Sequence, residues 1–202
     1  MPLWLGSQPL VLASKSDIRG KILAAAGLRF AIKPARVDER AIEASAGVTG
    51  AAAVASLLAR AKAEAVAASM PGHAVLGADQ TLALGDERFS KPANREDAAR
   101  QLCALRGKTH ALHSALALVR DGEMLFECVE TARLTMRDFS DRFLDTYLDL
   151  SGTSSLASVG AYQLEGIGIH LFERVEGDYF TILGLPLLPL LAFLRDEGFV
   201  DG

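Results

Sequence analysis

The segment VLGADQT, residues 75–81, is the stretch that decides how this chain is interpreted. Residues 74–78 are apolar or glycine, so we expect a buried strand that ends on the carboxylate of Asp79 and the amide of Gln80. A charge at the end of a buried strand is costly unless it is paired or binds a ligand. Lys91 follows on a nearby loop. An acid and a lysine in such positions are what a site for phosphate and metal requires.

The composition excludes several classes of protein. A chain of 202 residues, half of them hydrophobic, suits one domain, which we expect to span residues 1–202. The net charge of −4 argues against nucleic-acid binding, which usually needs a basic face. No apolar run approaches the ~20 residues of a membrane span, and the first residues do not resemble a signal peptide. We therefore expect a cytoplasmic protein in which Cys103 and Cys128 are reduced and buried.

Apolar periodicity and turn residues predict strands and helices that alternate along the chain. Strands are expected at residues 10–13, 30–33 and 74–78, and as a hairpin over 109–119 and 124–136. Residues 81–84 are expected either to continue the strand over 74–78 or to pair with it through a turn at Gly85 and Asp86. Helices are expected at residues 17–26, 51–69, 94–105, 140–150 and 187–197, with a loop over 151–168. This order predicts an α/β fold, a single domain with a mixed, strongly twisted sheet flanked by helices.

Three further segments carry residues that suit phosphate chemistry. Ser14 and Arg19 surround the start of a helix that follows a strand, where backbone N–H groups favour an anion. Glu39 lies in an acidic pair of a loop, and Lys62 lies among the alanines of the helix over 51–69. Taken alone, each of these has an ordinary alternative: a capped helix, a solvated acid and a surface lysine.

Other common catalytic arrangements are absent from the sequence. His110 and His113 are three residues apart on an expected strand, so they point to opposite faces and cannot bind one metal. There is no Rossmann glycine fingerprint, no Walker lysine loop and no serine in a nucleophile elbow.

Taken in order, these segments resemble the Maf family of nucleoside triphosphate pyrophosphatases over residues 10–199. The family's opening Leu-Ala-Ser-x-Ser-Pro-x-Arg is matched by Leu12, Ala13, Ser14, Ser16 and Arg19. Later family segments are matched by Val37 to Glu39, Ala59 with Lys62 and Ala63, Gly77 with Asp79, Lys91 with Pro92, Leu105 to His110, Gly160 to Tyr162 and Gly184 to Pro186. Ser90 replaces the glycine that the family places before Lys91.

The resemblance implies hydrolysis of a nucleoside triphosphate between the α and β phosphates, in a fold with two lobes around a central cleft. It implies a divalent cation, Mg²⁺ or Mn²⁺, held by Glu39 and Asp79, and a homodimer. Asp79 would orient or deprotonate the attacking water. Lys62, Lys91 and Arg19 would neutralise the triphosphate, and Ser14 would donate to a phosphate oxygen. Phosphoryl transfer needs such positioning and charge stabilisation more than covalent catalysis.

Three substrate-binding positions resemble the family branch that acts on 7-methyl-GTP: Ile18, Gln80 and Glu165. Methylation at N7 makes guanine cationic, and a glutamate can accept from N1–H and the 2-amino group while offsetting that charge. Asp17 replaces the family's proline, and we expect its carboxylate to point away from a bound phosphate.

Two other functions compete with a 7-methyl-GTP pyrophosphatase. One is a dTTP/UTP pyrophosphatase of the same family. The other is a non-catalytic nucleotide-binding regulator of cell division. A nucleic-acid-binding module is disfavoured by the acidic balance and the few aromatic residues.

Overall fold

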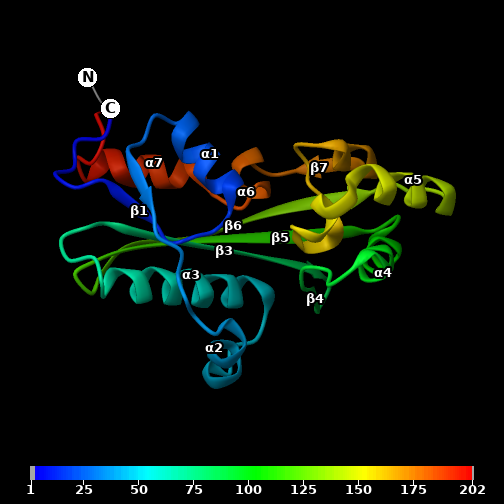
Figure 1. Cartoon of the computed structure of the whole chain (residues 1–202), viewed down its shortest axis with the longest axis horizontal. Helices are drawn as coiled ribbons and strands as arrows, with labels where there is room; N and C mark the ends of the chain where they lie inside the picture. The colour runs from blue at the N-terminus through cyan, green and yellow to red at the C-terminus, as the bar shows by residue number, and fades with distance from the viewer. Residues whose placement is uncertain (1–2, 202) are drawn as a thin grey trace. The chain divides into compact units, whose positions relative to one another are not determined.

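A computed structural model describes residues 3–201, and there it confirms the α/β class with a mixed sheet (Figure 1). The strands are β1 (Leu10–Leu12), β2 (Phe30–Ile32), β3 (Val75–Leu84), β4 (Glu87–Phe89), β5 (Thr109–Arg120), β6 (Glu123–Met136) and β7 (Phe172–Glu176). The α-helices are α1 (Asp17–Ala25), α2 (Glu39–Ala46), α3 (Ala51–Ala67), α4 (Arg95–Leu105), α5 (Asp141–Ser151), α6 (Tyr179–Ile182) and α7 (Leu187–Asp196).

The seven strands found within residues 3–201 form one sheet in the order β2-β1-β3-β5-β6-β7, with β4 paired to β3. Strand β1 pairs in parallel with β2, with Leu10 opposite Phe30, and with β3, with Val11 opposite Val75. The β3–β4 and β6–β7 pairs are antiparallel. The sheet is therefore mixed, as an early alternation of strands and helices followed by a hairpin predicts.

The chain divides into two compact units. The described part of the first unit comprises residues 3–80, 113–130 and 179–201, and the second comprises residues 81–112 and 131–178. Strands β3, β5 and β6 each continue from one unit into the other. A single functional domain over residues 1–202 and a cleft between two lobes stay predictions.

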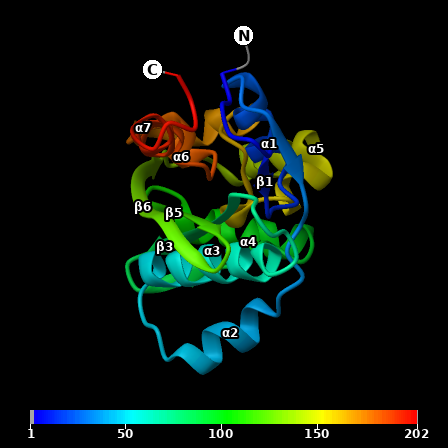
Figure 2. The same cartoon turned by 90° about the vertical axis from the view of Figure 1, so that its left-hand side faces the viewer.

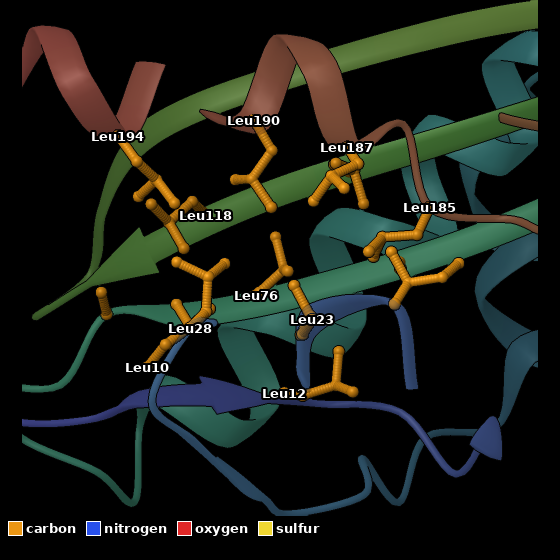
Figure 3. Packing of buried hydrophobic residues seen from close by; sticks show 14 of the residues in the cluster. Leu10, Leu12, Leu23, Leu28, Leu76, Leu118, Leu185, Leu187, Leu190 and Leu194 are labelled. Carbon is orange, nitrogen blue, oxygen red and sulfur yellow. The ribbon is translucent and has the colours of Figure 1, made fainter. Parts of the chain in front are cut away.

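One face of the sheet in the first unit is covered by α1 and α7 through a leucine-rich core (Figure 3). Side chains alternate along each strand, so Leu10, Leu12 and Leu76 point to the same side. Figure 3 shows three leucines of α7, those at positions 187, 190 and 194, directed at these strand residues. They recur at helical spacing, as Leu187, Leu190 and Leu194, and are all buried.

The opposite face of the first unit is covered by α3, which Figures 1 and 2 show running along the strands. The buried α3 residues Ala55, Ala59 and Ala63 follow one another at intervals of four, so they form a stripe on one side of the helix. At Gly77 of β3, a Cβ atom would lie 2.1 Å from the carbonyl oxygen of Ala59. Glycine and alanine therefore let the backbones of β3 and α3 meet.

The second unit has a smaller core of its own. His110 and Tyr162 are buried there, and the imidazole Nε2 lies 2.7 Å from the Tyr162 hydroxyl. Phe172 completes an aromatic group, with its ring centroid 4.8 Å from that of Tyr162. The segment over 151–168 was expected to be a loop. It instead contains two short 3-10 helices, Gly152–Leu156 and Val159–Ala161, and the start of a third, Ile167–Leu171.

Three further local predictions were wrong. Asp79 does not end a strand but lies inside β3, because residues 81–84 continue the strand, which was one of the two arrangements expected for them, and Leu82–Leu84 pair with β4. Residues after Val37 do not form a loop but open helix α2. Cys103 is exposed rather than buried, because α4 buries Ala98, Leu102 and Leu105 on its other side. Cys128 is half-buried, and both thiols are free.

Candidate active site

The centre of the site is an ion pair between Asp79 of β3 and Lys62 of α3. The Lys62 Nζ atom lies 2.5 Å from Asp79 Oδ1 and 2.8 Å from Glu39 Oε1. The side chains of Asp79 and Lys62 are only 11% and 14% exposed, whereas that of Glu39 is 48% exposed. One ammonium group thus joins a buried carboxylate to a more accessible one.

Local sequence explains why these three residues meet. Val75, Gly77 and Asp79 share one face of β3, and the close approach of α3 at Gly77 brings Lys62 onto the carboxylate. Glu39 is the first residue of α2, and the preceding Asp38 caps that helix by accepting from the N–H of Ala41 at 3.0 Å. Of the two neighbouring acids, therefore, Asp38 holds the backbone and Glu39 reaches Lys62.

Burial raises the pKa of Asp79 above its ordinary value, although the charges of Lys62 and Arg19 act in the opposite direction. Glu39 adds a smaller upward contribution. A carboxylate with a raised pKa is a stronger base than an ordinary aspartate. The contact with Lys62 engages Oδ1 and leaves the lone pairs of Oδ2 for a water molecule.

Arg19 of α1 ties together three segments of the first unit. Its Nε donates to the carbonyl of Gly184 at 2.8 Å, and its Nη1 donates to the carbonyl of Ala78 at 2.8 Å and to Ser14 Oγ at 3.2 Å. Burial lowers the pKa of Arg19, although the charges of Asp79 and Glu39 act in the opposite direction. A guanidinium nevertheless stays protonated in a protein. Arg19 thus commits much of its hydrogen-bonding capacity to the protein.

Ser14 is buried beside Arg19 at the end of β1. Its Oγ accepts from Arg19 Nη1 and from the N–H of Ser16, both at 3.2 Å. Since both bonds are accepted, the hydroxyl hydrogen is left to be donated, as a phosphate oxygen would require. Ser16 is the N-cap of α1 without a side-chain cap bond, and Asp17 is exposed in the first turn.

Gln80 reaches the opposite face of β3 from Asp79. Its Nε2 donates to Ser114 Oγ at 2.8 Å and to the carbonyls of Thr181 and Ile182 at 3.2 and 3.0 Å. The sequence-based prediction missed these partners. The signal for Ser114 was weak: a small polar residue on the side of β5 that otherwise carries Leu112, Leu116 and Leu118.

The remaining predicted residues lie elsewhere. Ile18 is partly buried and packs against the leucine-rich core of the first unit, so it has a structural contact besides any role at a ligand. Lys91, between β4 and α4, and Glu165, in a turn before the last 3-10 helix, are exposed residues of the second unit. Their approach to Asp79 stays a prediction.

The chemistry of the donors fits a magnesium-like cation. Hard oxygen ligands suit Mg²⁺ and Mn²⁺, and Mg²⁺ is usually bound by one or two carboxylates together with water and substrate phosphates. Glu39 and Asp79 supply two such groups, already gathered around one positive charge. Among residues 3–201 no three His, Cys, Asp or Glu side chains cluster as a complete metal site. A cation bound here would thus need further ligands, from water or from the substrate.

The described residues contain no helix that combines the length and the apolar character needed to span a bilayer.

Within the described first unit, Arg19 and Lys62 balance Glu39 and Asp79 in charge. A triphosphate would therefore need further positive charge beyond this group of four.

Comparison with known proteins gives a family and several relatives. The pattern of the Maf-like protein family matches residues 9–197. The chain is 55% identical over 197 residues to a protein of Nitrobacter winogradskyi named nucleoside triphosphate pyrophosphatase, covering 98% of both chains. A protein of the same name from Bradyrhizobium diazoefficiens is 56% identical, again with 98% of both covered. A 7-methyl-GTP pyrophosphatase of Rhizobium etli is 53% identical, covering 96% of this chain and 98% of that one.

Proposed function

The chain belongs to the Maf family, and from that premise we propose that it hydrolyses a nucleoside triphosphate to a monophosphate and pyrophosphate. The observation that carries this activity is the buried contact of Lys62 with Asp79 and its extension to Glu39. It provides a base of raised pKa beside a cation, which is the arrangement that attack of water on a phosphate needs. The relatives named nucleoside triphosphate pyrophosphatase support the same reaction.

Each residue of the first unit then has a task set by its contacts. Asp79 accepts a hydrogen bond from the attacking water through Oδ2 and takes its proton as the bond to the α phosphorus forms. Lys62, held against two carboxylates, offsets negative charge that develops on the phosphate oxygens. Ser14 donates its remaining hydroxyl hydrogen to a phosphate oxygen. The bond to pyrophosphate breaks, and pyrophosphate leaves.

A divalent cation fits this scheme through Glu39 and Asp79. When bound, it would supply charge neutralisation at the triphosphate and bring phosphate oxygens into line. Lys91 would add positive charge from the second unit, which suits a group of four side chains whose own charges cancel. We also expect a homodimer, as the resemblance to the family implies.

We propose 7-methyl-GTP as the preferred substrate. Glu165 and Gln80 support this choice by chemistry, since their oxygens suit the donors of a guanine edge and a carboxylate offsets the charge of the methylated ring. The relative from Rhizobium etli bears that name. Glu165→Gln should shift the preference toward UTP or dTTP, and an unchanged profile would remove Glu165 from base recognition.

The direct test is pyrophosphate release from 7-methyl-GTP, GTP, UTP and dTTP with Mg²⁺ or Mn²⁺ and after chelation by EDTA. Hydrolysis in ¹⁸O-labelled water should place the label in the monophosphate, because water attacks the α phosphorus. Asp79→Asn should abolish turnover, whereas Asp86→Asn, which removes an exposed acid in the β3–β4 turn, should not. Binding of nucleotides without release by the wild type would instead favour a non-catalytic regulator.

A further inference from the structure

The side-chain amide of Gln80 is held by three neighbours of the first unit. Nε2 carries two hydrogens and has Ser114 Oγ, Thr181 O and Ile182 O within 3.2 Å. The two carbonyls belong to α6, and Ser114 is fully buried on β5. These three acceptors are here named the amide lock.

The chemistry of the amide lock determines which end of the amide points inward. Carbonyl oxygens only accept hydrogen bonds, so Thr181 and Ile182 require the nitrogen of Gln80 rather than its oxygen. Ser114 donates its single hydroxyl hydrogen to Thr181 O at 2.7 Å and can therefore only accept from Gln80. Amide ends are often hard to tell apart, but here all three neighbours demand nitrogen. The oxygen Oε1 is consequently the end that is left for a ligand.

We propose that Ser114 is a positioning residue for nucleobase selection, because it helps to fix Gln80 as a hydrogen-bond acceptor. A base whose Watson–Crick edge carries donors is then favoured over one that presents a carbonyl at the same place. This role presupposes the proposed function, since Gln80 is adjacent to Asp79 in β3. It deepens that function by naming the substrate class as triphosphates of bases with a donating edge.

The segment that supplies the carbonyls is fixed from a second point. Gly184 follows α6, and its carbonyl accepts from Arg19 Nε at 2.8 Å. A Cβ at Gly184 would lie 3.2 Å from Arg19 Nη2 and 3.6 Å from Gln80 Cδ. Arg19 and Gln80 therefore both contact the stretch that ends α6. The side-chain amide of Gln80 thus has little freedom to exchange the positions of its nitrogen and oxygen.

A series of three purine nucleotides isolates this effect. GTP has an amino donor at C2, ITP has only hydrogen there, and XTP has a carbonyl acceptor. An acceptor fixed in the site should give the order GTP, ITP, XTP in kcat/KM, with GTP about tenfold or more above XTP.

The test compares four proteins on this series. Ser114→Ala should lower the ratio of GTP to XTP by about threefold or more, because one of the three acceptors is lost. Gln80→Met, which keeps the length of the side chain without polar atoms, should bring the ratio close to one. Ser155→Ala is the matched control, since Ser155 is also buried and donates to a carbonyl, that of Gly152, but in the second unit. Its ratio should equal that of the wild type.

The outcomes separate this role from the proposed function. A wild type that prefers XTP would overturn the assignment of Oε1 as the ligand-facing atom. An unchanged ratio in Ser114→Ala would overturn the role of Ser114. Failure of the wild type to hydrolyse any triphosphate would contradict the proposed function instead. Calorimetry would then give the ratio of the dissociation constants of GTP and XTP for each variant, and this ratio would test whether the amide lock sets the base preference. Melting temperatures identify any variant that has lost its fold.

Discussion

Asp79 and Gln80 are consecutive residues of β3 whose side chains reach opposite faces of the sheet. Asp79 contacts Lys62 of α3, whereas Gln80 contacts Ser114 of β5 and the carbonyls of α6. The alternation of a strand thus places a buried carboxylate and a hydrogen-bonded amide next to each other in sequence, but in contact with different elements. Changes on one face are therefore expected to act on the reaction and changes on the other on substrate choice.

We predict that Lys62→Met destabilises the fold and lowers kcat/KM by about 100-fold or more. Methionine keeps much of the side-chain length but leaves the buried Asp79 without its direct cation, which costs about 3 kcal/mol. Adding Asp79→Asn removes the unpaired charge, so the double variant should recover stability relative to Lys62→Met. Urea unfolding of the wild type, both single variants and the double variant measures this coupling.

The control for Lys62 is on the same helix. Arg60 pairs with Glu127 through Nη2 and Oε2 at 2.6 Å, but that pair is much more exposed to solvent. Arg60→Met should therefore change the free energy of unfolding by less than about 1 kcal/mol. A loss at Arg60 as large as that at Lys62 would contradict the importance of burial.

We predict that Gly77→Ala destabilises the protein by about 3 kcal/mol and lowers activity. The added methyl group would meet the backbone of Ala59 and Ala63, which cannot move aside as a flexible side chain does. Separation of α3 from β3 would also draw Lys62 away from Asp79. Gly20→Ala in α1 is the control, since its Cβ would have no neighbour nearer than 3.8 Å. Equal melting temperatures for Gly77→Ala and the wild type would refute the close contact.

The sequence was sufficient to predict the α/β class, because the class depends on local patterns, whereas the roles of the residues around Asp79 were expected only from the resemblance to a family and stay predictions. An apolar stretch that runs into an acid is visible in residues 75–81, and the alanine-rich stretch over 51–69 predicts a helix. The exact partners were not predictable. Lys62 meets Asp79 only because β3 and α3 touch at Gly77, and Ser114 meets Gln80 across strands far apart in sequence.

The extent of β3 shows a second limit. Asp79 and Gln80 predicted a strand end, with continuation through residues 81–84 left open, and in the structure the strand runs through them to Leu84, where it pairs with β4. Context of this kind commonly overrides local propensity in strands. The same holds for α2, where a short helix after Asp38 depends on a single side-chain cap and was expected to be a loop.

We predict that acid destabilises the protein through His110. Burial lowers the pKa of this imidazole to about 4, from an ordinary value of 6.5. The unfolded chain therefore binds a proton below pH 6.5 that the folded chain binds only near pH 4, and stability falls across that interval. The loss between pH 7 and pH 5 is about 2 kcal/mol from this group alone.

Urea unfolding at the two pH values, for the wild type and His110→Gln, checks this contribution. Glutamine keeps a polar group near the Tyr162 hydroxyl but does not titrate, so the variant should lose less stability on acidification. Its stability at pH 7 sets the baseline for the comparison. The same pH dependence in both proteins would assign the acid sensitivity to other groups.

Arg19→Lys is predicted to fail as a substitute although it keeps the positive charge. The guanidinium makes three separate hydrogen bonds, to Gly184, Ala78 and Ser14, in directions that one ammonium group cannot reproduce. We expect a loss of about 2 kcal/mol in unfolding free energy and a fall in kcat/KM approaching that of Arg19→Ala. Arg29→Lys, at an exposed position of the same unit, should have no comparable effect. If charge at the triphosphate were the main task of Arg19, the lysine variant would instead keep nearly the wild-type kcat/KM, and the structural bonds would have to be judged secondary.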